Sequence, residues 1–325
     1  MEKKILITGS AGFIGFSLAK SLLDQGYYIH GFDCMSNYYD VTLKRARNEI
    51  LKKYKNFSFT EEILENQEAL DKTITNFKPE IIIHLAAQAG VRYSIEEPRT
   101  YLSSNITGTF NIIEAAHKVK VNHLIIASSS SVYGANTNIP YRETDKAQTQ
   151  LSVYAATKKS TESIAHSYSN IWRLPITMLR FFTVYGPWGR PDMALFKFTK
   201  GIINGEPIDI YNNGEMYRDF TYIDDIVKGI IDLTTVPPKE EKNIDKNDSL
   251  SPVAPFRIVN IGNSNQVKLL DFVEAIESYL GKKAIRNYMP MQQGDVSATW
   301  ANTDLLKKLT GYAPKTEIKV GIKKF

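Results

Sequence analysis

The first fifteen residues constrain the fold more than any other stretch of the chain. A short apolar run over residues 3–9 leads into glycines at positions 9, 12 and 15, and an amphipathic stretch continues to residue 26. Between a strand and a helix, such glycines allow a tight turn, let the backbone approach a pyrophosphate, and let helix and strand pack closely. The helix N-terminus adds amide donors and the positive end of its dipole. The stretch therefore predicts a dinucleotide-binding turn formed by Gly9, Gly12 and Gly15.

The spacing of these glycines leaves a second interpretation open. It is GxxGxxG rather than the GxGxxG of many dehydrogenases, and glycines are also ordinary turn residues. The second predicted strand, residues 27–33, supports the nucleotide interpretation because it ends in Asp33, 24 residues after Gly9. An acid there accepts hydrogen bonds from the adenosine ribose hydroxyls and repels a 2′-phosphate. We therefore expect NAD rather than NADP as the cofactor.

Strands and helices alternate along the first half of the chain, and this alternation predicts an α/β fold. Helical periodicity lies between short apolar runs, for example over 13–26 and 107–120. The pattern is typical of a doubly wound parallel (Rossmann) sheet with helices on both faces. Runs that are apolar on both faces agree with buried parallel strands. The predicted strands are 3–9, 27–33, 56–61, 80–86, 122–128 and 175–181.

The alternation ends after about residue 185, where proline, glycine and aromatic residues become frequent. We expect a NAD-binding Rossmann domain over residues 1–185 and a smaller mixed α/β substrate domain over residues 186–325. The two are expected to interleave in part, with later segments returning to the first domain. Residues 236–255, "VPPKEEKNIDKNDSLSPVAP", predict an exposed loop.

Composition excludes several classes of protein. The net charge of +5 is spread over 325 residues, which is too diffuse for a nucleic-acid surface. No apolar stretch reaches 18 residues, so no membrane span is expected, and the N-terminal apolar run is too short for a signal peptide. Cys34 is the single cysteine, which excludes an internal disulfide and favours a reducing cytosol. We expect a cytoplasmic protein without a metal site.

A tyrosine and a lysine four residues apart carry the second chemical signal. Tyr154 and Lys158 lie in a helical pattern, so their side chains are neighbours on one face. A phenol with a pKa of about 10 is a poor base at neutral pH. A nearby ammonium lowers that pKa, and the pair can then take a proton from an alcohol as hydride leaves. The spacing alone is common in proteins, where surface packing is its usual meaning.

Four serines, 128 to 131, end the predicted strand 122–128. Serine is also an ordinary residue at strand ends and helix caps, because its hydroxyl competes well for backbone donors. Open α/β sheets, however, bind ligands at the carboxyl ends of their strands. We therefore expect the hydroxyl of Ser129 to bond the reacting oxygen and share its proton with the phenol of Tyr154.

Seven motifs in this order resemble the extended short-chain dehydrogenase/reductase superfamily. Within it the chain is similar to the nucleotide-sugar epimerases, and most similar to the UDP-glucuronate 4-epimerases, over nearly its whole length. The motifs are "ITGSAGFIG", "HLAAQAGVRYS", "SSSSVYG", "YAATK", "RFFTVYGPWGRPDMA", "YRDFTYIDD" and "MQQGDV".

The resemblance implies a role for each residue that matches a family motif. It implies a catalytic set of Ser129, Tyr154 and Lys158. It implies NAD-binding residues Gly9, Gly12, Phe13, Ile14, Gly15, Asp33, Glu62, Ile63, Leu85, Ala86, Ala87 and Gln88, together with Tyr154 and Lys158. It implies substrate-binding residues Arg92, Ser130, Ser131, Thr183, Arg190, Arg218, Gln292 and Asp295.

Three of these assignments have alternatives or departures. Arg190 is a plausible partner for a substrate carboxylate, but it could equally form a salt bridge within its loop. Arg218 matches a residue that holds the nucleotide diphosphate, but it could form a local ion pair with Asp219. Glu62 stands where the family usually has an aspartate near the adenine. The chain also stops at Phe325, where the family normally continues into a last helix, and we expect a shortened C-terminus without loss of activity.

The resemblance implies redox-neutral epimerisation of UDP-glucuronate to UDP-galacturonate through a 4-keto sugar, in polysaccharide biosynthesis. The serines at 130 and 131 stand where related dehydratases and decarboxylases carry acids, so they hold the sugar without diverting the 4-keto sugar. A 4-epimerase for UDP-glucose or UDP-N-acetylglucosamine (or its uronate), a decarboxylase or dehydratase, and a non-catalytic NAD sensor remain alternatives. Two helical stretches, 107–119 and 152–168, resemble the dimer-forming pair of the superfamily, so a homodimer is expected.

Overall fold

A seven-stranded parallel sheet forms the centre of the computed structural model, which describes residues 3–292 and 294–325. The strand order is β10-β6-β5-β4-β1-β2-β3, and every neighbouring pair is parallel. Six of the strands lie where the sequence predicted them. The strands are β1 (Lys4–Thr8), β2 (Tyr28–Asp33), β3 (Phe57–Glu61), β4 (Ile81–His84), β5 (His123–Ala127), β6 (Ile176–Phe181) and β10 (Phe256–Ile261).

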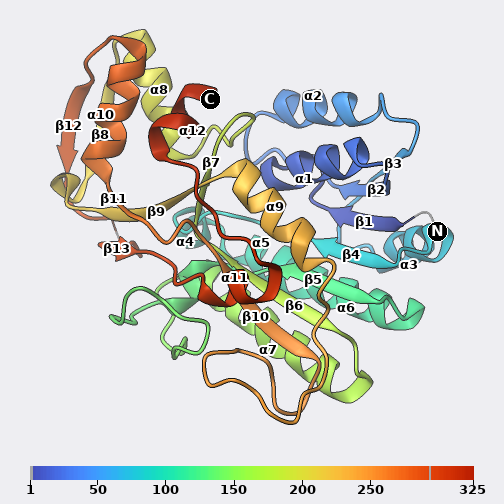
Figure 1. The fold of residues 1–325 in the computed structure, drawn as a ribbon. Coiled ribbons are helices and arrows are strands. Elements are labelled where there is room, and N and C mark those ends of the chain that lie inside the picture. The colour runs from blue at the N-terminus through green and yellow to red at the C-terminus, as the bar shows by residue number, and fades with distance from the viewer. Residues whose placement is uncertain (1–2, 293) are drawn as a thin grey trace.

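Helices cover both faces of this sheet, which confirms the doubly wound α/β fold (Figure 1). One face packs against α1 (Phe13–Asp24), α2 (Val41–Leu51) and α9 (Ile223–Leu233). The other packs against α3 (Gln67–Phe77), α6 (Gly108–Val119) and α7 (Val153–Trp172). Two short helices, α4 (Tyr93–Glu96) and α5 (Pro98–Tyr101), and a π-helical segment at Leu102–Thr107 lead into α6. No helix in the described part of the chain is long and apolar enough to cross a membrane.

The strand order places a ligand crevice at one end of the sheet. The chain runs outward from β1 to β2 and β3, then crosses back to β4 on the other side of β1. At such a switch point the loops after neighbouring strands turn in opposite directions, and ligands bind between them at the carboxyl ends of the strands. The crevice must therefore lie beyond the ends of β1 and β4.

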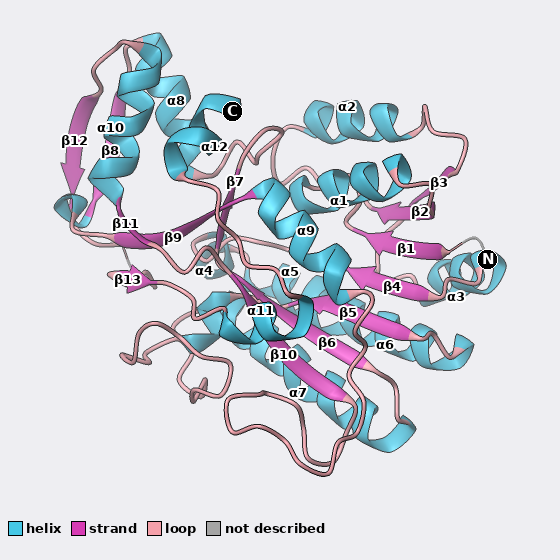
Figure 2. Ribbon diagram, in the orientation of Figure 1, coloured by secondary structure: helices cyan, strands magenta, loops and turns pink. Residues whose placement is uncertain are grey.

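Smaller sheets and helices form the second lobe (Figure 2), while one of the later helices, α11 (Asp304–Thr310), packs against α9 and β10 of the first lobe. Its strands and helices alternate with returns to the large sheet, since β10 pairs with β6 in register. The division into domains at residue 185 stays a prediction. The elements are β7 (Thr183–Tyr185), β8 (Pro207–Tyr211), β9 (Tyr217–Tyr222), β11 (Gln266–Lys268), β12 (Ile285–Met289), β13 (Ala298–Thr299), α8 (Ala194–Asn204), α10 (Leu269–Leu280) and α12 (Ile318–Lys324).

The stretch 236–255 contains no helix or strand, as the sequence predicted. Half of its residues are exposed, and Leu250 and Ala254 are buried. The side chain of Asp248 accepts two hydrogen bonds from Arg257 at the start of β10, at 2.9 and 3.2 Å. This ion pair fixes the end of the loop to the sheet.

A buried ion pair ties α7 to the sheet beneath the serine-rich strand end. Glu162 of α7 accepts two hydrogen bonds from Arg180 of β6, each 2.8 Å long, and both side chains are 2% exposed. Oε1 of Glu162 also accepts a 2.7 Å bond from the hydroxyl of Ser128. The guanidinium of Arg180 stacks on the ring of Tyr133 at 4.6 Å. Helix α7 and the end of β5 are therefore held in one register by a desolvated charge pair.

Removing Glu162 should be strongly destabilising, because Arg180 would remain buried and charged without its partner. We expect Glu162→Ala to lower the free energy of unfolding by about 3–5 kcal/mol, measured by denaturant unfolding with circular dichroism. The matched control is Glu49→Ala, which removes an exposed pair with Lys52 and should cost about 0–1 kcal/mol. Equal losses in the two variants would contradict the structural role of the buried pair.

Candidate active site

A cavity of about 940 Å³ opens at the carboxyl ends of the large sheet and continues between it and the second lobe. Almost every residue that the sequence singled out lines it, although the two predicted positions Ile63 and Gln292 do not. The side chain of Ile63 is half exposed beside the cavity. The predicted residues that line the cavity are Gly9, Gly12, Phe13, Ile14, Gly15, Asp33, Glu62, Leu85, Ala86, Ala87, Gln88, Arg92, Ser129, Ser130, Ser131, Tyr154, Lys158, Thr183, Arg190, Arg218 and Asp295.

The glycine turn has no room for larger residues. A Cβ on Gly9, whose φ is +73°, would lie 2.7 Å from the backbone nitrogen of Ala86. A Cβ on Gly15 would lie 2.0 Å from the carbonyl oxygen of Gly9. Helix α1 begins at Phe13 behind Gly12, which provides no side-chain cap. The first amides of α1 are thus left to a ligand, and the turn fits the pyrophosphate of a dinucleotide.

Asp33 lies at the end of β2, buried and already hydrogen bonded. Its Oδ2 accepts from the amide of Ala11 at 3.0 Å, and its Oδ1 accepts from the amide of Met35 at 2.9 Å. Burial raises the pKa of Asp33, while the Met35 amide and the ammonium of Lys44 lower it. Each carboxylate oxygen keeps a further lone pair, so ribose hydroxyls can still donate to it. This geometry fits the adenosine ribose of NAD.

The segment after β4 is fixed by an asparagine that the sequence analysis did not select. Asn105 is fully buried in the π-helical segment before α6, and its Oδ1 accepts from the amide of Gln88 at 2.7 Å. Its Nδ2 donates to the carbonyl of Gln88 and to the hydroxyl of Thr157, both at 3.1 Å. The hydroxyl of Thr157 in turn donates to the carbonyl of Tyr154 at 2.8 Å. The wall at Gln88 and the start of α7 are therefore positioned by the same side chain.

The predicted catalytic residues meet at the end of β5. Helix α7 begins behind Ser152, whose hydroxyl caps it by accepting from the amide of Ala155 at 3.1 Å. One turn later, the buried ammonium of Lys158 donates to the carbonyl of Ala127, the last residue of β5, at 2.8 Å. Ser129 and Tyr154 line the same cavity, and the hydroxyl of Ser129 lowers the pKa of the phenol of Tyr154.

The pKa shifts of Tyr154 and Lys158 differ from those expected if Lys158 activates the phenol. Burial raises the pKa of Tyr154, and the hydrogen bond from Ser129 and the positive charge of Arg190 lower it. Burial lowers the pKa of Lys158 to about 8. Lys158 is thus close to its charge transition at physiological pH, and the charge of Arg190 lowers the pKa of the phenol.

Arg190 lies in the loop after β7, and its side chain is held by an acidic neighbour. Its Nε donates to Oδ1 of Asp192 at 3.0 Å, and one terminal nitrogen donates to Oδ2. The phenol of Tyr38 also donates to Asp192, at 3.3 Å, and its ring lies beneath the guanidinium at 5.8 Å. The sequence left open whether Arg190 faces the substrate or forms a loop ion pair. The structure shows the ion pair and also places the residue on the cavity wall beside Tyr154.

The four serines differ in how their hydroxyls are engaged. All four serines line the cavity, but the hydroxyl of Ser128 is engaged by Glu162, as described above. Ser129 caps the short 3₁₀ turn over Ser130–Tyr133, since its Oγ accepts from the amide of Ser131 at 3.2 Å. The serine ladder therefore combines a buried anchor with hydroxyls that remain available to a ligand.

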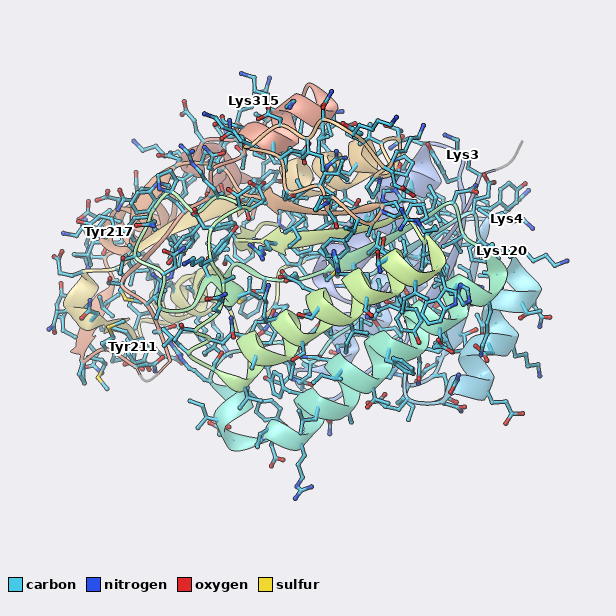
Figure 3. The ribbon with its side chains drawn as sticks, turned by 90° about the horizontal axis from the view of Figure 1, so that it is seen from below. Lys3, Lys4, Lys120, Tyr211, Tyr217 and Lys315 are labelled. Carbon is cyan, nitrogen blue, oxygen red and sulfur yellow. The ribbon has the colours of Figure 1, made fainter. Side chains whose placement is uncertain are left out.

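A second group of charges lies at the far end of the cavity. Arg92 and Asp295 approach to 3.8 Å, and the guanidinium of Arg92 lies over the ring of Tyr211 at 4.7 Å. Arg218 donates to the carbonyls of Tyr217 and Ser297, at 3.0 and 3.3 Å. Figure 3 shows Tyr211 and Tyr217 at the end of the molecule opposite Lys3, Lys4 and Lys120. Among the described residues, no ion pair joins Arg218 to Asp219, the alternative that the sequence left open.

Sequence reasoning also missed several polar residues of the wall. They come from both lobes, and local periodicity does not show which of them face a shared cavity, because the cavity wall is formed by segments far apart in the chain. Lys44 lies on α2, and its ammonium donates to Ser36 at 2.8 Å. The missed polar lining residues include Ser36, Tyr38, Lys44, Ser104, Asp192, Lys197, Asp209 and Tyr211.

Comparison with known proteins identifies the family. Residues 5–246, well over half of the chain, match the family described as "NAD dependent epimerase/dehydratase family". The chain belongs to this family. The family and the cofactor that the sequence predicted, NAD, are therefore confirmed.

The relatives of this epimerase/dehydratase family member share nearly its full length. It is 52% identical to a probable UDP-glucuronate 4-epimerase of Rhizobium meliloti (strain 1021), over 99% of this chain and 95% of that protein. The structure is similar to UDP-glucuronic acid 4-epimerase from Bacillus cereus in complex with UDP-glucuronic acid and NAD, with a TM-score of 0.88 and 33% identity over 99% and 97% of the two chains. It is also similar to UDP-glucose 4-epimerase from Thermotoga maritima with UDP-glucose, with a TM-score of 0.83 and 28% identity over 98% and 96%.

The lowered pKa of Lys158 predicts a pH-dependent cost of folding in this family member. Below pH 8 the lysine is charged in the folded and the unfolded chain, and only the folded chain bears the cost of burying the charge. Above about 10.5 it is neutral in both states and the cost disappears. We expect Lys158→Met to raise the free energy of unfolding of the ligand-free protein by about 1–3 kcal/mol at pH 7, with the difference shrinking between pH 8 and about 10.5.

This difference can be measured by denaturant unfolding at several pH values. Lys53→Met, which removes an exposed lysine on the surface, is the control and should show a flat difference. A constant difference for Lys158→Met across the same range would contradict the cost assigned to its buried charge.

Proposed function

We propose that this protein is a NAD-dependent 4-epimerase that interconverts UDP-glucuronate and UDP-galacturonate. One observation carries the proposal. The phenol of Tyr154, the neutral hydroxyl of Ser129 and the cationic side chain of Arg190 line the same cavity as the dinucleotide turn, and both Ser129 and Arg190 lower the pKa of the phenol. Relatives whose names state this activity share up to 52% of their residues with the chain.

The acid–base work falls to Tyr154 and its neighbours. The glycine turn and Asp33 would hold NAD, which would supply the acceptor and donor for the hydride of C4. The phenol of Tyr154 takes the proton of the C4 hydroxyl, and the hydroxyl of Ser129 bonds the same oxygen. The charge of Arg190 stabilises the phenolate that must form. Lys158, with its pKa near 8, adds a second positive charge when it is protonated.

Rotation of the 4-keto sugar needs a weak hold on the sugar and a strong hold on the nucleotide. Ser130, Ser131 and Thr183 supply neutral hydroxyls on the sugar side of the cavity. Hydroxyls orient a carboxylate without the acid strength that would promote loss of CO₂ from a β-keto acid. Arg218 and Asp295 supply the charged contacts at the nucleotide side.

A neutral-sugar 4-epimerase is the second candidate. The pairing of Arg190 with Asp192 favours it, because an arginine already neutralised offers less to a substrate carboxylate. The guanidinium has five donors, however, and Asp192 engages only two of its nitrogens. Donors remain for a uronate, and this supports UDP-glucuronate as the substrate.

Helices α6 and α7 lie side by side on the face turned toward the viewer in Figure 3. They expose large apolar side chains, among them Phe110, Ile171 and Trp172. We propose that the protein is a homodimer formed through these two helices. We also propose a cytoplasmic location and a role in polysaccharide biosynthesis.

The role of Tyr154 predicts a specific defect. Tyr154→Phe keeps the ring but removes the acid–base group, so we expect the fold and NAD binding to persist while turnover falls by at least ~10²-fold. Turnover is measured by NMR of the UDP-sugar products, and NAD content by release on denaturation. Tyr217→Phe, outside the cavity lining, is the control. Near-normal turnover of Tyr154→Phe would remove the phenol from the mechanism.

The role of Arg190 predicts the substrate. Charge-assisted hydrogen bonds contribute roughly 1.5–3 kcal/mol each, so wild type should prefer UDP-glucuronate to UDP-glucose in kcat/KM by about tenfold or more. We expect Arg190→Ala to lose most of this preference, whereas Arg45→Ala, an exposed arginine on α2, should keep it.

Two results would change the proposal. If wild type prefers UDP-glucose, the neutral-sugar epimerase takes the place of the uronate enzyme. If the uronate preference survives Arg190→Ala, the carboxylate partner is another residue, and Arg92 is the next candidate although it lies beside Asp295 in this structure.

A further inference from the structure

Arg47 is an arginine of α2 that is completely buried, and the reaction as described above gives it no task. One terminal nitrogen donates to the carbonyl of Ala11 at 2.9 Å and to the phenol of Tyr39 at 2.8 Å. The other donates to the carbonyl of Trp188 and, at 3.4 Å, to that of Gly189. A single guanidinium therefore joins the glycine turn to a loop that lies 141 residues after Arg47 in the chain.

The guanidinium of Arg47 is unusual because it is charged and buried without an acidic partner among the described residues. Across residues 3–292 and 294–325 no carboxylate forms an ion pair with Arg47. Its partners are backbone carbonyls and a phenol, and its Nε has no partner. Burying an arginine in this way is costly unless its hydrogen bonds are needed where they lie. The hydrogen bonds of Arg47 therefore indicate that the carbonyls it binds must be held in place.

The loop that Arg47 binds contains two residues with a positive φ, Gly186 and Trp188. Trp188 has a φ of +62°, in the left-handed region that non-glycine residues rarely occupy. Its ring packs edge-on against Phe16 of α1 at 5.5 Å. Gly186 has a φ of +143°, and a Cβ there would lie 2.6 Å from the side chain of Ile223. This conformation is held from the Rossmann side, by α1 and by Arg47.

We propose that Arg47 is a positioning residue that sets the place of Arg190 relative to the bound dinucleotide. Arg190 follows directly after the two carbonyls that Arg47 binds, and Ala11 lies between the glycines of the turn. The position of Arg190 on the cavity wall is therefore coupled to the turn that fits the pyrophosphate. The inference rests on the proposed function, in which Arg190 recognises the carboxylate of the sugar.

The coupling depends on the shape of the arginine side chain. Its planar fork presents two nitrogens that reach the two segments at once, whereas a lysine ammonium is a single point charge. Arg47→Lys keeps the buried charge but cannot bind Ala11 and Trp188 together. It therefore separates the positioning role from a general need for positive charge near Asp33 and the dinucleotide.

The test compares Arg47→Lys in the wild-type and Arg190→Ala backgrounds. In the wild-type background we expect the preference for UDP-glucuronate over UDP-glucose to fall about tenfold through KM for the uronate, with any change in kcat equal for the two sugars because the effect of Arg190 on the phenol does not depend on the sugar. In the Arg190→Ala background the same substitution should change the preference less than about twofold, because the group that it positions is gone. Arg45→Lys, on the same helix and exposed, is the control.

A second readout does not depend on catalysis. Hydrogen exchange measured by mass spectrometry should be faster over residues 186–193 in Arg47→Lys with NAD bound, while peptides of α7 remain unchanged. If Arg47→Lys does not fold, Tyr39→Phe removes one acceptor and should give smaller changes in the same direction.

Equal losses for both sugars in both backgrounds, with unchanged exchange over 186–193, would overturn the proposal and leave Arg47 a structural residue. A wild type without uronate preference would instead overturn the proposed function. In that case faster exchange over 186–193 would still support the link between the turn and the loop, and unchanged exchange would overturn it.

Discussion

The packing of α7 against the end of β5 is the constraint on which the rest of the site depends. Two side chains one turn apart on the helix hold the strand end, since Lys158 binds the carbonyl of Ala127 and Glu162 binds the hydroxyl of Ser128. With these two contacts in place, Ser129 can turn toward the cavity and meet the phenol of Tyr154. A shift of α7 by one residue would break both contacts and remove the phenol from the serine.

The cavity is lined by positive charges that are held at a cost. Burial lowers the pKa of Lys158 to about 8 and lowers that of Arg218 as well. Arg190 lies among aromatic side chains with one acidic partner. A protein has no stability reason to desolvate cations in this way, whereas an anionic dinucleotide and an anionic sugar nucleotide would compensate for the cost. A gain in stability on replacing such a cation would therefore reflect a trade between folding and function.

Side chains from the Rossmann side contact the loop that carries Arg190. Tyr38, from the segment between β2 and α2, bonds Asp192 of the second lobe, and Arg47 of α2 bonds the loop before it. Both contacts come from the Rossmann side, next to Asp33, and both end at the loop that carries Arg190. Under the proposed function, the selectivity for a uronate would therefore depend on how the Rossmann side places the cation of Arg190.

The sequence by itself determined the elements whose signals are local. The glycine turn, six strands of the large sheet, Asp33 at the end of β2 and the Tyr154–Lys158 face of α7 all follow from spacing, because each depends on neighbours within about one turn or strand. The tertiary structure alone decided which distant groups meet. Asp192 and Tyr38 around Arg190, Asn105 against Gln88, and Arg47 between two loops are joined across long stretches of chain. The periodicity of the sequence does not predict such pairings. They form only when the two lobes pack together and bring particular buried donors and acceptors next to each other.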